Sequence, residues 1–235
     1  MHDTLGPETR SDTPEAAACE FRGLLGAGRG LQGQAGGGDP GIIEQLRGLD
    51  NWAEARGALP SGEWLTTAER GGAEHFIQHA TGEHRVLKIT YPGQFGLRMR
   101  FTLRPGVMPK RLADAIGLMP ATPLEYLDRL TLHNELFGRS MMFLGLVRQE
   151  KGWSFVTSQI FLRGEKPSIA QIAAFMAENG FRKLGDENAY FRESDHLAVF
   201  DAHARNFVLV DGIPVPFDVI PQYVSERFEA LLGLW

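Results

Sequence analysis

From residue 64 onward, hydrophobic and polar positions alternate in short runs that predict β-strands. Three runs follow one another: a strand that leads into Gly71 and Gly72, a return strand at "HFIQHA", and a third strand at "RVLKIT". Turn sequences separate the three runs. Two longer runs, "MMFLGLVRQE" and "WSFVTSQIFL", are joined by the turn "EKGW". The pattern predicts a β-meander followed by a hairpin.

Helix signals stand out at two places. In "TPLEYLDRLTLHNELFG", Thr122 suits the N-cap, Pro123 the first turn and Gly138 the end of a helix. In "SIAQIAAFMAENG", an apolar stripe runs from the capping residue Ser168 to Gly180. Shorter helices are predicted at residues 42–57, 110–119 and 224–235.

The remaining sequence alternates short strands and turns, with strands predicted at "AYFRES", "LAVFD", "NFVLV" and "VPFDVI". Strands, a helix, strands, then a helix and small hairpins indicate an α+β protein with a sheet-rich first lobe and a compact second lobe. We expect an N-terminal arm at residues 1–62, a first lobe at 63–162 and a reduced second lobe at 163–235.

The arm differs in composition from the rest of the chain. "LLGAGRGLQGQAGGGDPG" is dominated by glycine and small residues, so we expect it to be flexible. It contains a G-x-G-x-x-G match at Gly28, Gly30 and Gly33, but no predicted strand precedes it, so low complexity is the better explanation. The single cysteine, Cys19, cannot form an internal disulfide, which fits a reducing compartment.

Composition excludes some classes of partner. A net charge of −5 gives no general attraction to nucleic-acid phosphates. No run approaches the roughly 18 apolar residues that a membrane span requires. We therefore expect a cytoplasmic protein that binds neither nucleic acid nor membrane. His75, His79 and His84 are near one another in sequence but lack the spacing of a zinc site.

Polar side chains that could bind a metal interrupt the late strand-like sequence "AVFDAHARNFVLVDGIPVPFDVIP". Asp201 ends one apolar run, Asn206 opens the next, and Asp218 follows a hairpin turn at Gly212. These three side chains can therefore converge at one end of the hairpin. Phosphoryl transfer needs such a set: a carboxylate that orients the attacking hydroxyl, and oxygen ligands that hold Mg²⁺ on nucleotide phosphates.

"DAHARNFVLVDGIPVPFDVI" resembles the catalytic and metal-binding segments of the protein-kinase-like fold, particularly its aminoglycoside-kinase and other atypical branches. The resemblance implies that Asp201 is the catalytic base, that Asn206 and Asp218 are metal ligands, and that His203 braces the loop. Val219 and the isoleucine after it replace the usual Phe-Gly. No arginine precedes Asp201, so the usual activation-loop switch is not expected.

The resemblance extends to the first lobe. It implies that Lys88 in "RVLKIT" holds the nucleotide phosphates beneath the turn at Gly71 and Gly72. "LHNELFG" resembles a helix of the kinase-like domains found in polyvalent proteins of phages and mobile elements, which favours Glu135 over Glu125 or the intervening Asp128 as the partner of the lysine.

The strand "SFVTSQIFLRG" would lead into the hinge between the lobes. There, backbone groups near Gln159, Ile160 and Phe161 would bind adenine.

Each candidate also has a structural interpretation. Lys88 could lie on an edge strand with its ammonium group in water. Asp201 and Asn206 could be ordinary turn residues, and Asp218 could cap a turn. Taken together, the positions favour an ATP- and Mg²⁺-dependent phosphotransferase whose acceptor is unknown. The alternatives are a pseudokinase or nucleotide-binding interaction module, and an adaptor that binds no nucleotide.

Overall fold

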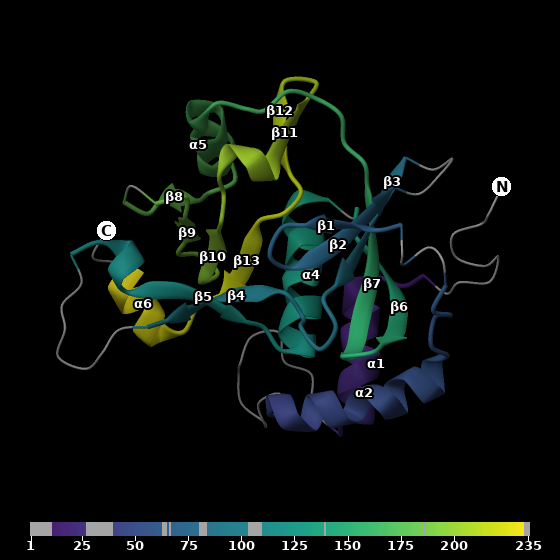
Figure 1. Cartoon of the computed structure of the whole chain (residues 1–235). Helices are drawn as coiled ribbons and strands as arrows, with labels where there is room; N and C mark the ends of the chain where they lie inside the picture. Colours follow the sequence, from purple (N-terminus) through teal and green to yellow (C-terminus); the bar gives the residue numbers. More distant parts are fainter. Residues whose placement is uncertain are drawn as a thin grey trace. The chain divides into compact units, whose positions relative to one another are not determined.

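The computed structural model describes residues 11–26, 40–62, 65, 67–79, 84–102, 110–138, 140–185 and 187–232. The chain divides into two compact units, coloured along the sequence in Figure 1. Unit 1 consists of Met1–Leu97, Pro120–Asn134 and Gly138–Phe161. Unit 2 consists of Arg98–Met119, Glu135–Phe137 and Leu162–Trp235. The glycine-rich run with Gly28, Gly30 and Gly33 lies outside the described residues.

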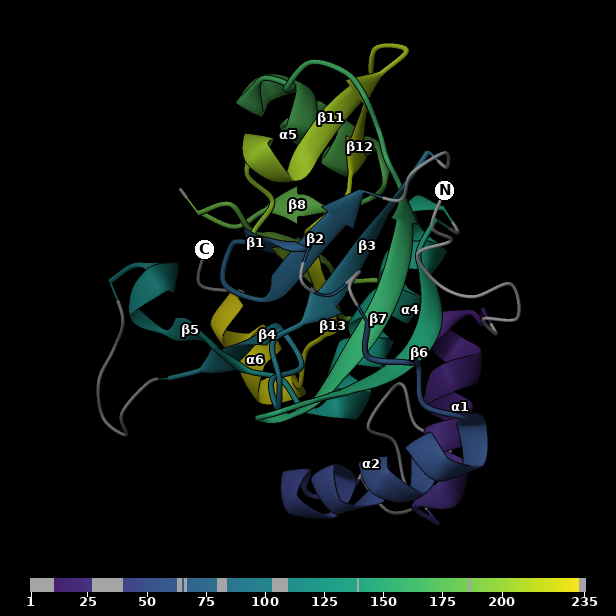
Figure 2. The same ribbon diagram turned by 45° about the vertical axis from the view of Figure 1, so that its right-hand side comes forward.

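Unit 1 contains a five-stranded antiparallel sheet with the strand order β1-β2-β3-β7-β6. Figure 2 shows these strands side by side. Their bounds are β1 (Glu69–Gly71), β2 (His75–His79), β3 (Arg85–Thr90), β6 (Met142–Gln149) and β7 (Gly152–Ile160). The meander and the hairpin predicted from alternating hydrophobicity are both present, and β7 joins them by pairing with β3.

Helix α4 (Pro123–Phe137) follows the predicted boundaries because its capping signals are local. The Thr122 hydroxyl accepts a hydrogen bond from the Glu125 N–H, and the Glu125 carboxylate accepts one from the Thr122 N–H at 2.9 Å. Gly138 ends the helix at φ 98°, a conformation that favours glycine. The helix therefore begins and ends where its sequence dictates.

Two helices come from the N-terminal part of the chain, α1 (Pro14–Leu24) and α2 (Ile42–Arg56). The sequence predicted α2 but not α1, although Thr13 and Pro14 repeat the cap that begins α4. Both helices contribute fully buried aromatic rings to unit 1, Phe21 from α1 and Trp52 from α2. The described part of residues 1–62 is therefore packed against the sheet, which differs from the arm that glycine content predicted.

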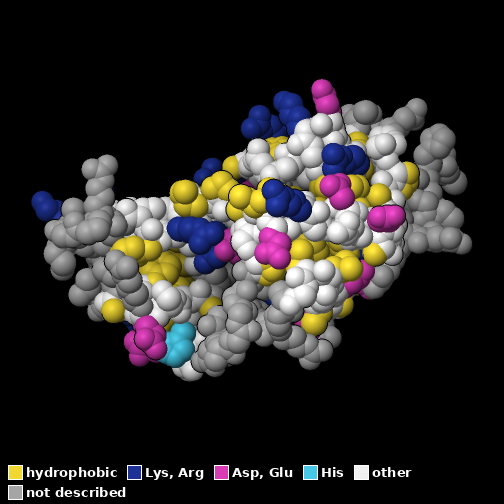
Figure 3. Space-filling view, turned by 90° about the horizontal axis from the view of Figure 1, so that it is seen from below, with side chains coloured by type: hydrophobic (Ala, Val, Ile, Leu, Met, Phe, Trp, Pro, Cys, Tyr) yellow, Lys and Arg dark blue, Asp and Glu magenta, His cyan; other side chains and the backbone are white. Residues whose placement is uncertain are grey.

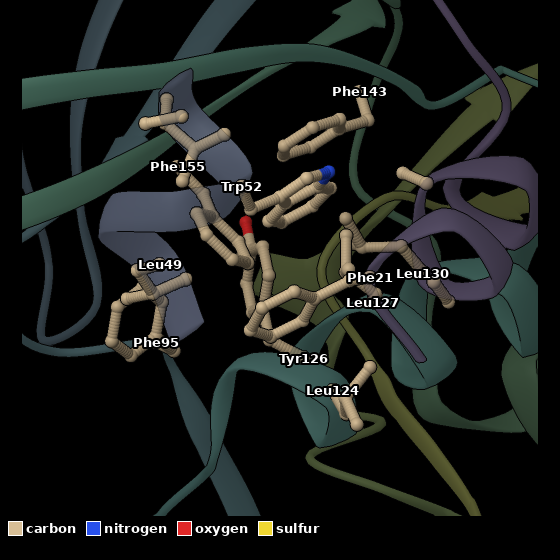
Figure 4. Packing of buried hydrophobic residues seen from close by; sticks show 14 of the residues in the cluster. Phe21, Leu49, Trp52, Phe95, Leu124, Tyr126, Leu127, Leu130, Phe143 and Phe155 are labelled. Atoms are coloured by element: carbon tan, nitrogen blue, oxygen red, sulfur yellow. The ribbon is translucent and has the colours of Figure 1, made fainter. Parts of the chain in front are cut away.

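The main core of unit 1 is built around Trp52, as Figure 4 shows. Its ring stacks between Phe21, at a centroid distance of 4.5 Å, and Phe143 of β6, at 5.3 Å. Phe155 of β7 meets the same indole edge-on at 5.7 Å. Aromatic contacts of this kind stabilise a core beyond the area that they bury. Segments far apart in sequence therefore share one core.

Unit 2 contains a four-stranded antiparallel sheet with the order β13-β10-β9-β8 and two separate two-stranded pairs, β11-β12 and β4-β5. The strand bounds are β4 (Leu97–Phe101), β5 (Ile116–Pro120), β8 (Arg182–Lys183), β9 (Tyr190–Arg192), β10 (Leu197–Phe200), β11 (Phe207–Val210), β12 (Ile213–Pro216) and β13 (Ile220–Tyr223). The helices are α5 (Ile169–Glu178), α6 (Glu226–Leu232) and the 3₁₀ turns η1 (Leu112–Asp114) and η2 (Ala204–Asn206).

The helix predicted at residues 110–119 is wrong. The 3₁₀ turn η1 and strand β5 occupy this segment, and β5 pairs with β4. Ile116 of β5, together with Met99 and Phe101 of β4, packs against the core of unit 2. A ten-residue segment has little helical stability of its own, so strand pairing and burial decide its structure.

The α+β class expected from the sequence is confirmed by these sheets and helices. The two-lobed arrangement of the kinase-like fold remains a prediction. Among the described residues, no helix combines the length and the apolar character needed to cross a membrane. On the face seen in Figure 3, basic and acidic side chains lie interspersed with hydrophobic ones.

Candidate functional site

Lys88 lies in the central strand of the unit 1 sheet. Strand β3 pairs with β2 on one side and β7 on the other, so that Ile77 and Thr157 lie directly across from the lysine. Lys88 is only 8% exposed. The alternative interpretation, an edge-strand lysine with its ammonium group in water, is therefore wrong.

Strand alternation assigns Lys88 to one face of the sheet. The flanking residues Leu87 and Ile89 belong to an apolar cluster on the opposite face. Phe155, two residues before Thr157 on β7, lies on the same face as the lysine. Its ring packs near the ring of Tyr126 from α4, with 6.1 Å between the ring centroids. Helix α4 therefore packs on the face of the sheet that carries Lys88.

The glycine turn between β1 and β2 is held in place by side chains. Tyr91, next to the end of β3, donates its hydroxyl to the Gly72 carbonyl at 2.7 Å and accepts a hydrogen bond from Arg70 at 3.1 Å. Gly71 has no room for a side chain, since a Cβ there would come within 2.2 Å of Ile77. Gly72 has φ 84°, which favours glycine. Both glycines are thus required by the shape of this turn.

An ion pair connects this turn to α4. The Glu74 carboxylate accepts hydrogen bonds from the Arg129 guanidinium at 2.6 Å and from the Leu97 N–H at 3.1 Å. His75 and Tyr126 form a second link, with 2.9 Å between the imidazole Nε2 and the hydroxyl. Sequence reasoning gave these residues no role, although an arginine on an apolar helix face is a signal for a buried partner.

The three acidic side chains of α4 have different surroundings. Glu125 belongs to the capping box, and Asp128 forms an ion pair with Arg22 of α1 at 2.5 Å. Glu135 lies near the C-terminal end of the helix and is exposed. The two earlier acids thus have structural roles within unit 1.

The predicted hinge residues occupy the end of β7 and the position after it. Gln159 is buried, whereas Ile160 is 43% exposed. The Phe161 N–H donates to the His84 carbonyl at 2.8 Å and is therefore already engaged in the sheet. Any hydrogen bond to a base must use other backbone groups near this point.

In unit 2, Asp201 directly follows strand β10 and has φ 56°, a left-handed conformation that aspartate tolerates better than most residues. The Asn206 amide nitrogen donates to the Asp201 backbone carbonyl at 2.8 Å and to its carboxylate at 2.9 Å. His203 Nε2 lies 3.3 Å from the other carboxylate oxygen. The aspartate side chain is therefore oriented from two sides.

Strand pairing brings Asp218 to the same end of unit 2. Because β10 and β13 are antiparallel and Phe200 is opposite Ile220, the residues just after β10 lie beside those just before β13. The Phe217 N–H also donates to the Asn206 carbonyl at 3.0 Å. The single strand predicted at "VPFDVI" is wrong: β12 ends at Pro216, β13 begins at Ile220, and Asp218 occupies the bend between them.

The donor set suits a hard cation such as Mg²⁺. Both hydrogen bonds from the Asn206 amide nitrogen go to Asp201, which leaves the amide oxygen available as a ligand. Within the described ranges, no three His, Cys, Asp or Glu side chains are grouped as a metal site. Mg²⁺ is bound in proteins through oxygen atoms, and the carboxylates of Asp201 and Asp218 and the amide of Asn206 supply atoms of this type.

Comparison with known families gives one result. Residues 111–221 match the family described as a serine/threonine/tyrosine kinase found in polyvalent proteins. The resemblance to these kinases is confirmed. The match includes Glu135, Asp201, Asn206 and Asp218 but begins after Lys88. A search of curated proteins and a search of solved structures each gave no match.

The sheet of unit 1 extends beyond the matched residues. Strands β6 and β7 lie inside the match, and β3, outside it, pairs with β7 along five positions from Arg85 to Ile89. Lys88 thus belongs to a sheet to which the matched part contributes two strands. In unit 2, hydrogen bonds join Asn206 to Asp201, and the register of β10 and β13 places Asp218 at the same end of this strand pair. In unit 1, Lys88 and the glycine turn belong to one sheet.

Proposed function

We propose that this protein is an ATP- and Mg²⁺-dependent phosphotransferase of atypical kinase-like fold. The observation that carries the proposal is the arrangement in unit 2, where strand pairing sets Asp201, Asn206 and Asp218 at one end of the β10–β13 pair. The match to polyvalent-protein kinases supports it. The acceptor would be a small molecule, the protein itself or a specific protein, since α5 is the only helix among the described residues between β7 and Asp201.

Each unit 2 residue has a distinct role in the proposal. Asp201 accepts a hydrogen bond from the acceptor hydroxyl and so aims its oxygen at the phosphorus. Asn206 and Asp218 hold the metal through oxygen atoms. When bound, ATP supplies the phosphoryl group and Mg²⁺ neutralises charge on its phosphates. His203 keeps the Asp201 carboxylate in its orientation.

The residues of the predicted first lobe bind the nucleotide in this proposal. The Lys88 ammonium group holds the α and β phosphates, and the turn at Gly71 and Gly72 covers them. Glu135 pairs with Lys88 in this proposal, as the resemblance of "LHNELFG" to the kinase-like domains of polyvalent proteins implies. Backbone groups around Gln159, Ile160 and Phe161 hold the adenine base, with the Phe161 N–H excluded because His84 uses it.

The deciding experiment compares Asp218→Asn with Asp211→Asn. Asp211 lies in the exposed β11–β12 turn and serves as a matched carboxylate control. We expect phosphate transfer to fall about 10²–10³-fold in Asp218→Asn and to stay unchanged in Asp211→Asn. Transfer is measured by mass spectrometry of the protein and by ATP consumption. Equal turnover in both variants would refute the assignment.

A titration with ATP and Mg²⁺, read as the shift in melting temperature, separates the other functions. Stabilisation by nucleotide without any phosphorylated product would identify a nucleotide-binding module. No response to nucleotide would identify an adaptor that only retains the kinase-like shape.

A further inference from the structure

The N-terminal helices hold α4 by two polar contacts. Arg22 of α1, which is buried, forms the ion pair with Asp128 in the second turn of α4. The fully buried Gln45 of α2 accepts a hydrogen bond from the Leu124 N–H at 3.0 Å and donates one to the Pro40 carbonyl at 2.7 Å. The first N–H groups of a helix have no partner inside the helix. Gln45 therefore fixes the start of α4, and Arg22 fixes its rotation.

Apolar packing secures the same side of α4. Leu124, Leu127 and Leu130 share one buried cluster with Phe21 of α1 and Trp52 of α2, as Figure 4 shows. These helix positions lie three residues apart and so form one stripe. Any tilt of α4 would open this packing.

The N-terminal segment is in turn attached to the sheet. Asp12, before α1, exchanges two backbone hydrogen bonds with Phe143 of β6, at 2.9 and 2.8 Å. Leu59, after α2, donates its N–H to the Leu146 carbonyl at 2.7 Å. Both ends of the helical pair are thus anchored to β6, so the pair can act as a fixed support.

We propose that α1 and α2 are a built-in positioning element for α4, with Arg22 and Gln45 as positioning residues. This inference rests on the proposed function, in which α4 carries the partner of Lys88. The other side of α4 contacts the glycine turn through Arg129 and Glu74. The N-terminal pair thereby fixes the helix in the orientation used for transfer, and no activating partner or phosphorylation is needed to place it.

The test compares Arg22→Met with Arg148→Met. Arg148 of β6 forms an exposed ion pair with Asp50 of α2 at 3.1 Å, so its loss removes an arginine contact of the helical pair and leaves the buried contacts in place. In Arg22→Met, we expect amide hydrogen exchange of α4 to rise about tenfold. We expect kcat to fall about 10–10²-fold while the KM for ATP changes less than about threefold. Arg148→Met should leave both quantities near wild type.

Arg22→Lys adds a check on the charge, because a lysine keeps the positive charge that faces Asp128. This variant should recover most of the lost kcat. Unchanged exchange of α4 in Arg22→Met would overturn the inference, as would raised exchange with normal kcat, or equal effects of Arg22→Met and Arg148→Met. A wild-type protein that transfers no phosphate would instead refute the proposed function, and the exchange of α4 would still decide whether the helices position it.

Discussion

The ion pair between Glu74 and Arg129 should be among the strongest single contributions to the stability of unit 1. The Arg129 side chain is 6% exposed and the Glu74 side chain 14%, at 2.6 Å. Removal of one partner leaves the other as a largely buried charge without a counter-ion. In Arg129→Met, the Glu74 carboxylate would keep its hydrogen bond from the Leu97 N–H but lose its counter-ion.

Breaking a buried ion pair from one side costs about 3–5 kcal/mol. Because neither side chain is completely buried, we expect the lower limit, about 3 kcal/mol. A protein of this size loses about 2–3 kcal/mol of stability per molar urea, so the midpoint should fall by about 1–1.5 M. Tryptophan fluorescence is a suitable probe, since Trp52 is fully buried in the unit 1 core.

A double-mutant cycle with Glu74→Gln isolates the pair. The double variant should be more stable than the sum of the two single changes predicts, by at least about 1 kcal/mol. A cost below about 1 kcal/mol for Arg129→Met, or simple additivity, would show that the pair contributes no more than an exposed surface pair and would refute the reasoning.

Three further predictions concern other residues. Trp52→Ala should lower the free energy of unfolding by about 3–5 kcal/mol in urea titrations, because the ring is stacked on both faces, and a loss below about 1 kcal/mol would contradict this packing. Asp201→Asn should reduce phosphate transfer about 10²-fold with little change in melting temperature, since asparagine also tolerates the left-handed backbone; a large drop in melting temperature would indicate a structural role. Burial raises the pKa of the Tyr190 hydroxyl, which favours the neutral phenol in the folded state. The stability that the neutral Tyr190 contributes should therefore be fully present below about pH 10 and decline as pH rises through the raised pKa. Tyr190→Phe should flatten this decline in urea titrations at alkaline pH, and an identical pH profile would exclude Tyr190 as its cause.

Local signals predicted the parts of the fold that depend on nearby residues. Helix α4 was predictable because Thr122 and Glu125 cap each other, and α5 because Ser168 and Gln171 do the same. Helix α1 has a similar cap at Thr13, but it adjoins a glycine-rich run, and such a composition is typical of a flexible segment. Strand β5 could not be predicted, since its pairing with β4 and burial in unit 2 are non-local.

The contacts of the candidate site also divide into local ones, which the sequence predicts, and contacts between distant residues, which it does not predict. Asp201 and Asn206 are five positions apart, so local geometry was enough to predict their contact. That Asp218 joins them in one metal site stays a prediction. The link between Glu74 and Arg129 spans 55 positions, and the one between Arg22 and Asp128 spans 106. No periodicity reports contacts at such separations, because the pattern around a buried arginine indicates that it needs a partner but does not identify that partner.

The segment Arg98–Met119 leaves unit 1 after β3, supplies Met99, Phe101 and Ile116 to the core of unit 2, and returns to begin α4. Neither unit 1 nor unit 2 is therefore a continuous stretch of polypeptide. A fragment that starts after Phe161 would lack part of its hydrophobic interior, and a fragment that stops there would expose three apolar side chains to water. Separate expression of the two units would require moving the β4–β5 segment into the sequence of the second unit, that is, fusing residues 98–119 to the part that follows Phe161.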